Sequence, residues 1–270
     1  MYKYFIYGLI TYLSIYAAIF YVSLGKPSNT SKWVHDVYEK KTLIASKTSS
    51  PRIVISAGSS SMFGIDSKML ERAFKMPVVN YSVNAGLMLP VILYKTKQIL
   101  KEGDILIMPL EYDMYLYDGK PNEQMTDYIS SYEPRILKFL TIQEQLRIFW
   151  NITLKSIITK YVQDVQTPQG LYGVHNIDEN GDQIGSEKSK QSETFKKEVQ
   201  AAKPYNYNKL YKGNELAYMY LRDFAEHCRQ KHVRLILTPP ALLYKEEYKN
   251  QRFFKKFIDK LAKEGFTYIG

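Results

Sequence analysis

Cysteine is almost absent from this 270-residue chain, because Cys228 is the only one. A single thiol cannot form an internal disulfide, which excludes a disulfide scaffold. The phosphate-binding patterns Gly-x-x-x-x-Gly-Lys-Ser/Thr and Gly-x-Gly-x-x-Gly are missing, which argues against a nucleotide-binding function. Histidine is also scarce, and no Cys/His zinc spacing surrounds the four present: His35, His175, His227 and His232. We therefore expect no cofactor and no metal.

The overall composition is that of a folded domain. Hydrophobic residues make up 45% of the chain and charged residues 24%, which excludes a disordered, collagen-like or polytopic membrane protein. Lys and Arg number 37 against 27 Asp and Glu, a formal charge of +10, which favours an anionic partner such as phospholipid or an acidic polymer. Nucleic acid is disfavoured as a partner, because no recognition motif accompanies the charge.

The amino end carries a long uncharged segment. Residues 4–25 contain no charge and lie between Lys3 and Lys26, and a helix of that length spans a bilayer core of about 30 Å. We predict an uncleaved transmembrane anchor over residues 1–25 in the cytoplasmic membrane; a cleaved signal peptide is the weaker alternative. The lysines after the segment favour a cytoplasmic domain, but long domains translocate largely regardless of charge, so we expect an extracytoplasmic one.

The rest of the chain alternates between strand-like and helical patterns. Residues 26–51 are polar at both ends and are predicted to be a stalk, with an α/β domain over residues 52–270. Alternation of this kind predicts a doubly wound, flavodoxin-like parallel sheet of about five strands, covered on both faces. The expected strands are residues 53–55, 78–81, 104–109, 233–238 and 266–269, and the expected helices include 67–74 (capped by Asp66), a helix ending near 100, 214–230 and 245–264.

A middle region, residues 111–212, breaks this alternation and is predicted to be an insertion that shapes a substrate surface. It contains a helical pattern over 133–161 and a hairpin over 173–184, whose Asn180-Gly181 pair suits a type I′ turn. The acidic spacing around that turn is also reminiscent of a calcium loop. The glycine, however, stands at the fourth position rather than the sixth and no glutamate stands at the twelfth, which favours the turn.

Small polar residues follow the first expected strand. In open parallel sheets, ligands bind beyond the carboxyl ends of the strands. The loop Gly58-Ser59-Ser60-Ser61 places hydroxyls and backbone N–H groups between a strand and a helix start, which suits a nucleophile and an oxyanion. The spacing alone is also compatible with two other interpretations of this loop, an ordinary Gly/Ser turn or a phosphate-binding loop. The pentapeptide Gly-x-Ser-x-Gly is missing, so an α/β-hydrolase elbow does not fit.

Three segments resemble the SGNH/GDSL-type hydrolases. Residues 53–66 (IVISAGSSSMFGID) resemble the first block of that family, in the Gly-Ser-Ser variant found in membrane-anchored proteins of bacterial envelope polymer modification. Residues 78–87 (VVNYSVNAGL) resemble the second block, and residues 103–112 (GDILIMPLEY) resemble the third strand with its following loop. The family includes accessory proteins of teichoic-acid D-alanylation and of alginate acetylation. The resemblance therefore implies acyl-ester chemistry on an envelope glycan.

The resemblance also implies roles for individual residues. Ser60 corresponds to the nucleophile, with its own N–H and that of Gly86 as oxyanion donors, and Ser59 takes the place of the family's aspartate. The third block departs from the family's Gly-x-Asn-Asp, so no asparagine is available there and Glu111 or Tyr112 is expected to line the site. The family's Asp-x-x-His, which supplies the general base, is missing, because the sequence stops at Gly270 as the last expected strand finishes.

Two hypotheses follow from that departure. Either the sequence is truncated at its carboxyl end and the protein is a serine esterase or O-acyltransferase, acting on a glycan or glycolipid and supplied by a membrane-bound acyl donor protein. Or it is a non-catalytic carbohydrate-binding or scaffold component of a membrane polysaccharide complex. In the second case some tyrosines of the insertion would stack on sugar rings, although a core role is the commoner expectation for such residues: Tyr112, Tyr115, Tyr117, Tyr128 and Tyr132.

Overall fold

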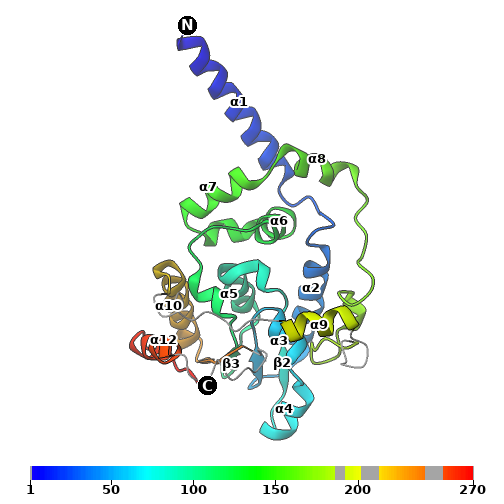
Figure 1. Cartoon of the computed structure of the whole chain (residues 1–270), viewed down its shortest axis with the longest axis vertical. Helices are drawn as coiled ribbons and strands as arrows, with labels where there is room; N and C mark the ends of the chain where they lie inside the picture. The colour runs from blue at the N-terminus through cyan, green and yellow to red at the C-terminus, as the bar shows by residue number, and fades with distance from the viewer. Residues whose placement is uncertain (1, 186–191, 202–212, 241–251, 270) are drawn as a thin grey trace.

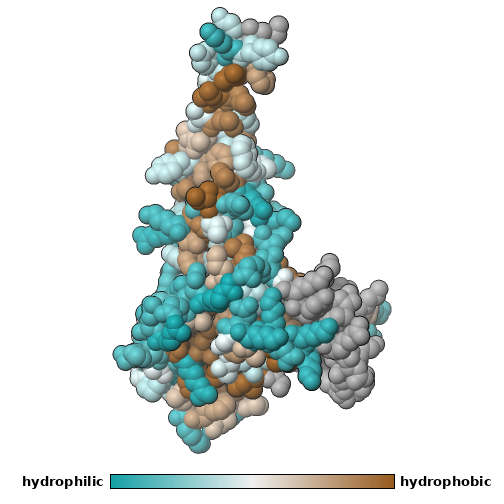
Figure 2. Space-filling view, turned by 90° about the vertical axis from the view of Figure 1, so that its left-hand side faces the viewer, coloured by the Kyte–Doolittle hydropathy of each residue, from teal (hydrophilic) through white to brown (hydrophobic). Residues whose placement is uncertain are grey.

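The structure is a computed structural model that describes residues 2–185, 192–201, 213–240 and 252–269. Helix α1 (Tyr2–Ser23) projects as a rod from one end of an α/β domain, and the sheet lies toward the other end (Figure 1). Hydrophobic side chains gather along α1 (Figure 2). In length and composition α1 is the one helix of the described residues that could cross a membrane. This agrees with the predicted anchor segment.

Four parallel strands form the sheet in the order β2-β1-β3-β4. They are β1 (Ile53–Ile55), β2 (Val78–Asn80), β3 (Ile105–Met108) and β4 (Arg234–Leu237). The predicted parallel α/β fold is therefore confirmed. A fifth strand over residues 266–269 was expected, but this segment makes only one isolated parallel bridge, between Tyr268 and Leu237, so the described residues form four strands.

The helices and 3-10 turns connect and cover these strands. The expected cap at Asp66 accepts a hydrogen bond from the Met69 N–H, and the expected helix after residue 214 begins where predicted. Of the helix expected over 245–264, residues 245–251 lie outside the described part. The elements are α2 (Lys32–Lys47), α3 (Ser59–Gly64), α4 (Ser67–Phe74), η1 (Ala85–Leu87), α5 (Met88–Ile99), η2 (Tyr112–Leu116), α6 (Glu123–Ser131), η3 (Pro134–Phe139), α7 (Ile142–Asn151), α8 (Leu154–Val162), η4 (Val174–Asn176), α9 (Glu193–Ala201), α10 (Glu215–Gln230) and α12 (Arg252–Lys263).

The two faces of the sheet are covered unequally. Across the sheet, β2 is added on one side of β1, whereas β3 and then β4 are added on its other side. Right-handed crossovers therefore place α4 on one face and α5 and α10 on the opposite face. Val54 and Leu106 point into the large core, whereas Ile53 and Ile55 belong to a small second cluster that Leu70 of α4 covers. The site at the strand ends is thus supported mainly from the α5 side.

The segment predicted as a stalk is instead a helix of the core, so that prediction was wrong for α2. Val34, Val37, Tyr38 and Ala45 recur on one side of the helix and are buried, and the Tyr38 ring lies 5.3 Å from the ring of Tyr81 after β2. Spacings of three and four residues place such side chains on one helical face. The polar ends of the segment concealed this apolar stripe.

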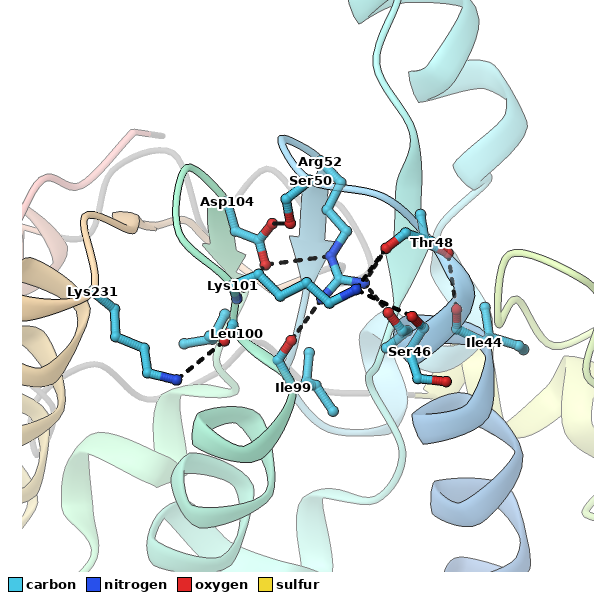
Figure 3. Close-up of polar contacts among 11 residues, drawn as sticks. Ile44, Ser46, Thr48, Ser50, Arg52, Ile99, Leu100, Lys101, Asp104 and Lys231 are labelled. Carbon is cyan, nitrogen blue, oxygen red and sulfur yellow. Dashed lines mark hydrogen bonds and ion pairs between the residues drawn. The ribbon is translucent and has the colours of Figure 1, made fainter.

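A buried ion pair fastens α2 beneath the sheet (Figure 3). Arg52 and Asp104 precede β1 and β3, and their side chains are fully buried with Nε 3.3 Å from Oδ2. The guanidinium also donates to the Ile99 carbonyl at the end of α5 (2.6 Å) and to the carbonyls of Ala45 and Thr48 at the end of α2. These are helix-terminal carbonyls that have no intrahelical partner. One side chain thus joins two helix ends to two strands.

The hairpin of the insertion closes with a different turn from the predicted type I′. Only Gly181 has a positive φ (+89°), whereas a type I′ turn needs positive φ at both central residues. The Gly181 N–H donates to the Asp178 carbonyl (3.2 Å), and the Asp178 N–H donates to the Asp182 carbonyl (3.0 Å). This is a three-residue loop with a left-handed glycine at its end. Strand pairing beyond the loop is limited to a bridge between Ile177 and Gln183.

The side chain of Asp182, after that turn, is buried and holds the insertion against the sheet. Its carboxylate accepts hydrogen bonds from the Ser67 N–H (2.6 Å), the Ser67 hydroxyl (2.8 Å) and the Asn80 amide (2.9 Å). The insertion is thereby tied to the start of α4 and the end of β2. Among the described residues no group of three or more His, Cys, Asp or Glu side chains could hold a metal ion.

Candidate functional site

The candidate site lies where the strand order reverses. In a sheet of order β2-β1-β3-β4, the connections after β1 and β3 leave in opposite directions, and ligands of such sheets bind at the carboxyl ends of these two strands. Ser60 stands in the first turn of α3, directly after β1, and Glu111 follows β3. The two predicted site residues are therefore brought together from loops about fifty positions apart.

Glu111 is the hydrogen-bond partner of Ser60. The Ser60 hydroxyl donates to Glu111 Oε1 at 2.7 Å, and the Ser60 N–H donates to the same oxygen at 3.1 Å. The Gly58 N–H donates to Oε2 at 3.0 Å. Three donors from one loop thus converge on one carboxylate, and both Ser60 and Glu111 are half-buried. An ionised carboxylate only accepts hydrogen bonds, so the hydroxyl hydrogen points toward Glu111.

Gly58 allows the loops to approach this closely. A Cβ atom at this position would lie 2.5 Å from Glu111 Oε1 and 2.6 Å from the Ala85 Cβ atom. No side chain fits at such distances, so glycine is required here by lack of space and not by a left-handed backbone conformation. Because Ala85 begins η1, the loops after β1, β2 and β3 all meet at Gly58.

Gly86, the second predicted oxyanion donor, lies in that third loop. Its N–H donates to Asn84 Oδ1 at 2.5 Å, within an Asx turn. Since the Ser60 N–H is bound to Glu111, both amides that the resemblance implies as oxyanion donors already have acceptors. A substrate oxygen has to displace these acceptors. Sequence analysis did not identify Asn84 as the group that occupies the Gly86 amide.

The other two predicted site residues, Ser59 and Tyr112, differ in how far they are buried. Ser59 is half-buried at the first position of α3, beside Ser60. Tyr112 is buried, and its ring packs edge-on against Phe254 and Phe257 of α12, with ring centroids 5.9 and 6.0 Å apart. The prediction that Tyr112 lines the site was wrong in this respect, because its aromatic ring is used in the core.

The predicted sugar-stacking tyrosines are mostly unavailable to a ligand. Tyr132 is half-buried, and its ring stacks on that of His35 with the centroids 4.5 Å apart. The others have no more than 5% of their surface exposed, so the stacking interpretation is wrong for them: Tyr112, Tyr115, Tyr117 and Tyr128. Their core role was the commoner expectation.

No protein-family model, curated protein or solved structure matches this chain.

None of the histidines serves Ser60. Burial lowers the pKa of His35, which stacks on Tyr132, and burial together with the charge of Lys97 lowers the pKa of His227. Within the described ranges, no hydrogen bond connects a histidine to Ser60. Glu111 is accordingly the group placed to accept the serine proton.

Lys41 of α2 is linked to the candidate site through hydrogen bonds to the loop after β2. It is fully buried, and its ammonium donates to the Ser82 carbonyl in the loop after β2. The Ser82 hydroxyl in turn accepts from the Ala57 N–H at 3.0 Å, one residue before Gly58. Sequence analysis missed Lys41. The signal was its position on the apolar stripe of α2, where an unpaired lysine would be costly.

The environment of Lys41 predicts a pH dependence of stability. Burial lowers its pKa from 10.5 to about 7, a shift that the nearby Asp182 and Asp178 carboxylates oppose. The unfolded chain therefore binds this proton more tightly, and the lysine's contribution to stability rises as pH increases from about 7 toward 10.5. We expect the Lys41→Met variant to lose this rise, which is at most about 1.4 kcal/mol per pH unit.

The measurement is the urea midpoint of each variant in detergent, at neutral pH and about two pH units higher. Lys47→Met, at the exposed end of the same helix, is the matched control. An equal change with pH in the wild type and in Lys41→Met would show that Lys41 titrates alike in the folded and unfolded chains.

A separate cavity of about 520 Å³ lies on the α1 side of the domain. It is bounded by the segment that follows α1, by α6 and by α8. Hydroxyl and amide groups make up much of its wall, together with Asp127 and Lys160, and none of the predicted site residues lines it. The hydroxyl and amide groups come from Ser28, Asn29, Thr30, Thr126, Ser130, Asn151, Thr153, Ser156, Thr159 and Gln163.

Proposed function

We propose that this chain is a membrane-anchored serine esterase or O-acyltransferase of the SGNH type, acting on acyl esters of an envelope glycan or glycolipid. The observation that carries the proposal is the 2.7 Å hydrogen bond from the Ser60 hydroxyl to Glu111 at the carboxyl ends of β1 and β3. The resemblance of three sequence blocks to that family adds support, because the loops that end these blocks meet at Gly58.

The proposed chemistry uses the carboxylate where the family uses histidine. Ser60 Oγ attacks the ester carbonyl carbon while its proton passes to Glu111. The bond to the leaving alcohol then breaks, and that alcohol takes the proton, which leaves the acyl group on Ser60. Attack by water or by an acceptor hydroxyl reverses these steps. The amides of Ser60 and Gly86 are the nearest donors for the oxyanion, once a substrate displaces their present acceptors.

The proposed setting is the outer side of the cytoplasmic membrane. An α1 helix across the bilayer would hold Ser60 and Glu111 near membrane-bound glycans, and a membrane-bound acyl donor protein would supply the acyl group. The helix is long and apolar enough for this anchoring role. Its length and hydropathy support the anchor, and the outer side is proposed because long domains translocate largely regardless of charge.

Labelling with a fluorophosphonate probe tests the proposal. We expect the detergent-solubilised wild type to form a covalent adduct at Ser60, because the probe requires an activated serine hydroxyl. Ser60→Ala should abolish labelling, and Ser59→Ala, which removes the neighbouring hydroxyl from the same helix turn, should retain it. Undiminished labelling of Ser60→Ala, or a folded wild type that does not react, would overturn the assignment.

Non-catalytic glycan binding is the second candidate, and the 520 Å³ cavity favours it. A wall rich in hydroxyl and amide groups suits a sugar headgroup. In this case glycan binding measured by saturation-transfer NMR would persist in Ser60→Ala. Asp127→Ala would weaken it, because the Asp127 carboxylate lines the cavity and accepts a hydrogen bond from Ser28 in the same wall.

A further inference from the structure

Helices α7 and α8 expose apolar side chains where a soluble domain would be polar. On α7 they recur every fourth residue, at Ile142, Leu146 and Trp150, with 75%, 53% and 60% of each residue's surface exposed. Such spacing places them on one side of the helix. The corresponding exposed residues of α8 are Leu154, Ile158, Tyr161 and Val162. A contiguous exposed apolar surface of this kind marks an interaction site.

The opposite sides of these helices are firmly bound to the domain. Glu144 of α7 is fully buried and accepts hydrogen bonds from the hydroxyls of Tyr220 (2.5 Å) and Tyr117. Ile148 of α7 and Ile157 of α8 are also buried. The outward faces are therefore not produced by loosely attached helices that could rotate to hide them.

The apolar faces continue directly into α1. The Tyr16 ring packs edge-on against Phe149 (centroids 4.9 Å apart) and stacks on Trp150 (6.3 Å), and its hydroxyl donates to the Phe149 and Ile152 carbonyls at the end of α7. On α8, the Tyr161 hydroxyl donates to the Val22 carbonyl (3.3 Å). Both helices lie across the base of α1 in Figure 1.

These contacts fix the depth of α7 and α8 relative to α1. Tyr16 lies seven residues before the end of α1 at Ser23, which is about 10 Å along the helix axis. When α1 spans a bilayer core of about 30 Å, residues packed against Tyr16 cannot lie in bulk water. Trp150 and Phe149 would then lie among the upper acyl chains, just below the headgroups. The Tyr16 hydroxyl satisfies carbonyls that lipid could not.

The charges beside these faces match an anionic lipid surface. From Ile142 to Gln163 the only acidic residue is the buried Glu144, whereas the basic residues of this stretch are Arg147, Lys155 and Lys160. Lys26 follows α1 and lies over the Tyr161 ring, 5.3 Å from its centroid. Helices that lie in a membrane interface combine basic residues with Trp, Phe and Leu in this way.

We propose that α7 and α8 lie in the membrane interface, with their outward faces buried in the lipid bilayer that α1 crosses. The occupant of these faces is lipid rather than another protein, because α1 already places them at lipid depth and the charged residues of both helices, apart from the buried Glu144, are basic. The inference rests on the anchoring role of α1 in the proposed function. Its consequence is that the domain is held in a fixed orientation, with the hydroxyl-lined cavity beside α8 facing the headgroups.

The two tryptophans of the chain provide the test. Trp33→Phe leaves Trp150 as the only indole, and Trp150→Phe leaves Trp33, which is half-buried in α2 beside Tyr172. Each full-length variant is reconstituted into vesicles of phosphatidylcholine and phosphatidylglycerol that carry bromine near the top of the acyl chains. We expect roughly twofold or greater quenching of Trp150 emission, since interfacial faces lie about 5–10 Å into the boundary. Trp33 emission should be unaffected.

Two results would overturn the inference. One is Trp150 emission that brominated lipid leaves unchanged while aqueous iodide quenches it. The other is equal quenching of Trp33 and Trp150, which would indicate non-specific adsorption of the domain. Resistance of the protein to carbonate extraction reports on α1 alone, so an anchored protein with unquenched Trp150 contradicts this inference without contradicting the anchor. Loss of anchoring together with loss of quenching contradicts both.

Discussion

Replacing Glu111 by glutamine is expected to slow acylation of Ser60 by about 10²–10⁴-fold, which is the usual contribution of a positioned general base. The amide keeps the size of the carboxylate but cannot take the serine proton. Glutamine retains one oxygen, which can accept from the Gly58 N–H or the Ser60 N–H, whereas the carboxylate accepts from these two groups through different oxygens. The measurement is the rate of fluorophosphonate labelling, together with the turnover of a short-chain aryl ester.

Glu102→Gln is the matched control, since this glutamate is exposed in the turn before β3, at the opposite edge of the sheet. Its labelling rate should equal that of the wild type. If Glu111→Gln labels as fast as the wild type, Glu111 acts only as a cap for α3, whose own N-cap residue, Gly58, has no side chain to supply a hydrogen bond. A faster rate would mean that the carboxylate blocks the oxyanion site.

The sheet could be predicted because its determinants are local. Short β-branched runs such as Ile53-Val54-Ile55, each followed by a helical pattern, specify a parallel α/β sheet wherever they occur. The location of the candidate site followed from the same reasoning, since parallel strands bring their carboxyl ends to one edge. The pairing of Ser60 with Glu111 did not follow, because a hydrogen bond between loops after β1 and β3 depends on strand order, which the sequence leaves open.

The roles of Lys41 and of α7 were not predicted, because the charged side chains of Lys41 and Glu144 are buried and apolar side chains of α7 are exposed. The side chain of Lys41 is buried on an apolar stripe, although lysine is normally exposed. On α7, the sequence pattern shows amphipathicity but does not say which side faces the core. Leu146 and Trp150 are exposed while Glu144 is buried, the opposite of a soluble helix. Only the contacts of Glu144 with Tyr220 and of Tyr16 with Trp150 reveal the orientation.

The Arg52–Asp104 pair is expected to give the largest loss of stability. Asp104→Ala leaves a fully buried guanidinium without its counter-ion, which typically costs about 3–5 kcal/mol. It also removes the acceptor for the Ser50 hydroxyl (2.6 Å) and for the Lys101 N–H (2.9 Å). The free energy of unfolding is measured from urea titrations in detergent. Asp36→Ala, which removes a partly exposed ion pair with Lys32 on α2, is the control and should cost no more than about 1 kcal/mol.

A double variant then separates the effect of the unpaired charge from that of the helix ends. If the isolated charge causes the loss in Asp104→Ala, the double variant Arg52→Met, Asp104→Leu should recover part of it, because apolar replacement of a whole buried pair is often nearly neutral. Recovery should nevertheless be incomplete. Methionine cannot donate to the carbonyls of Ala45, Thr48 and Ile99, and these helix ends would lose their partner. Full recovery would show that the ion pair, and not the fastening of α2 and α5, is what Arg52 contributes to the fold.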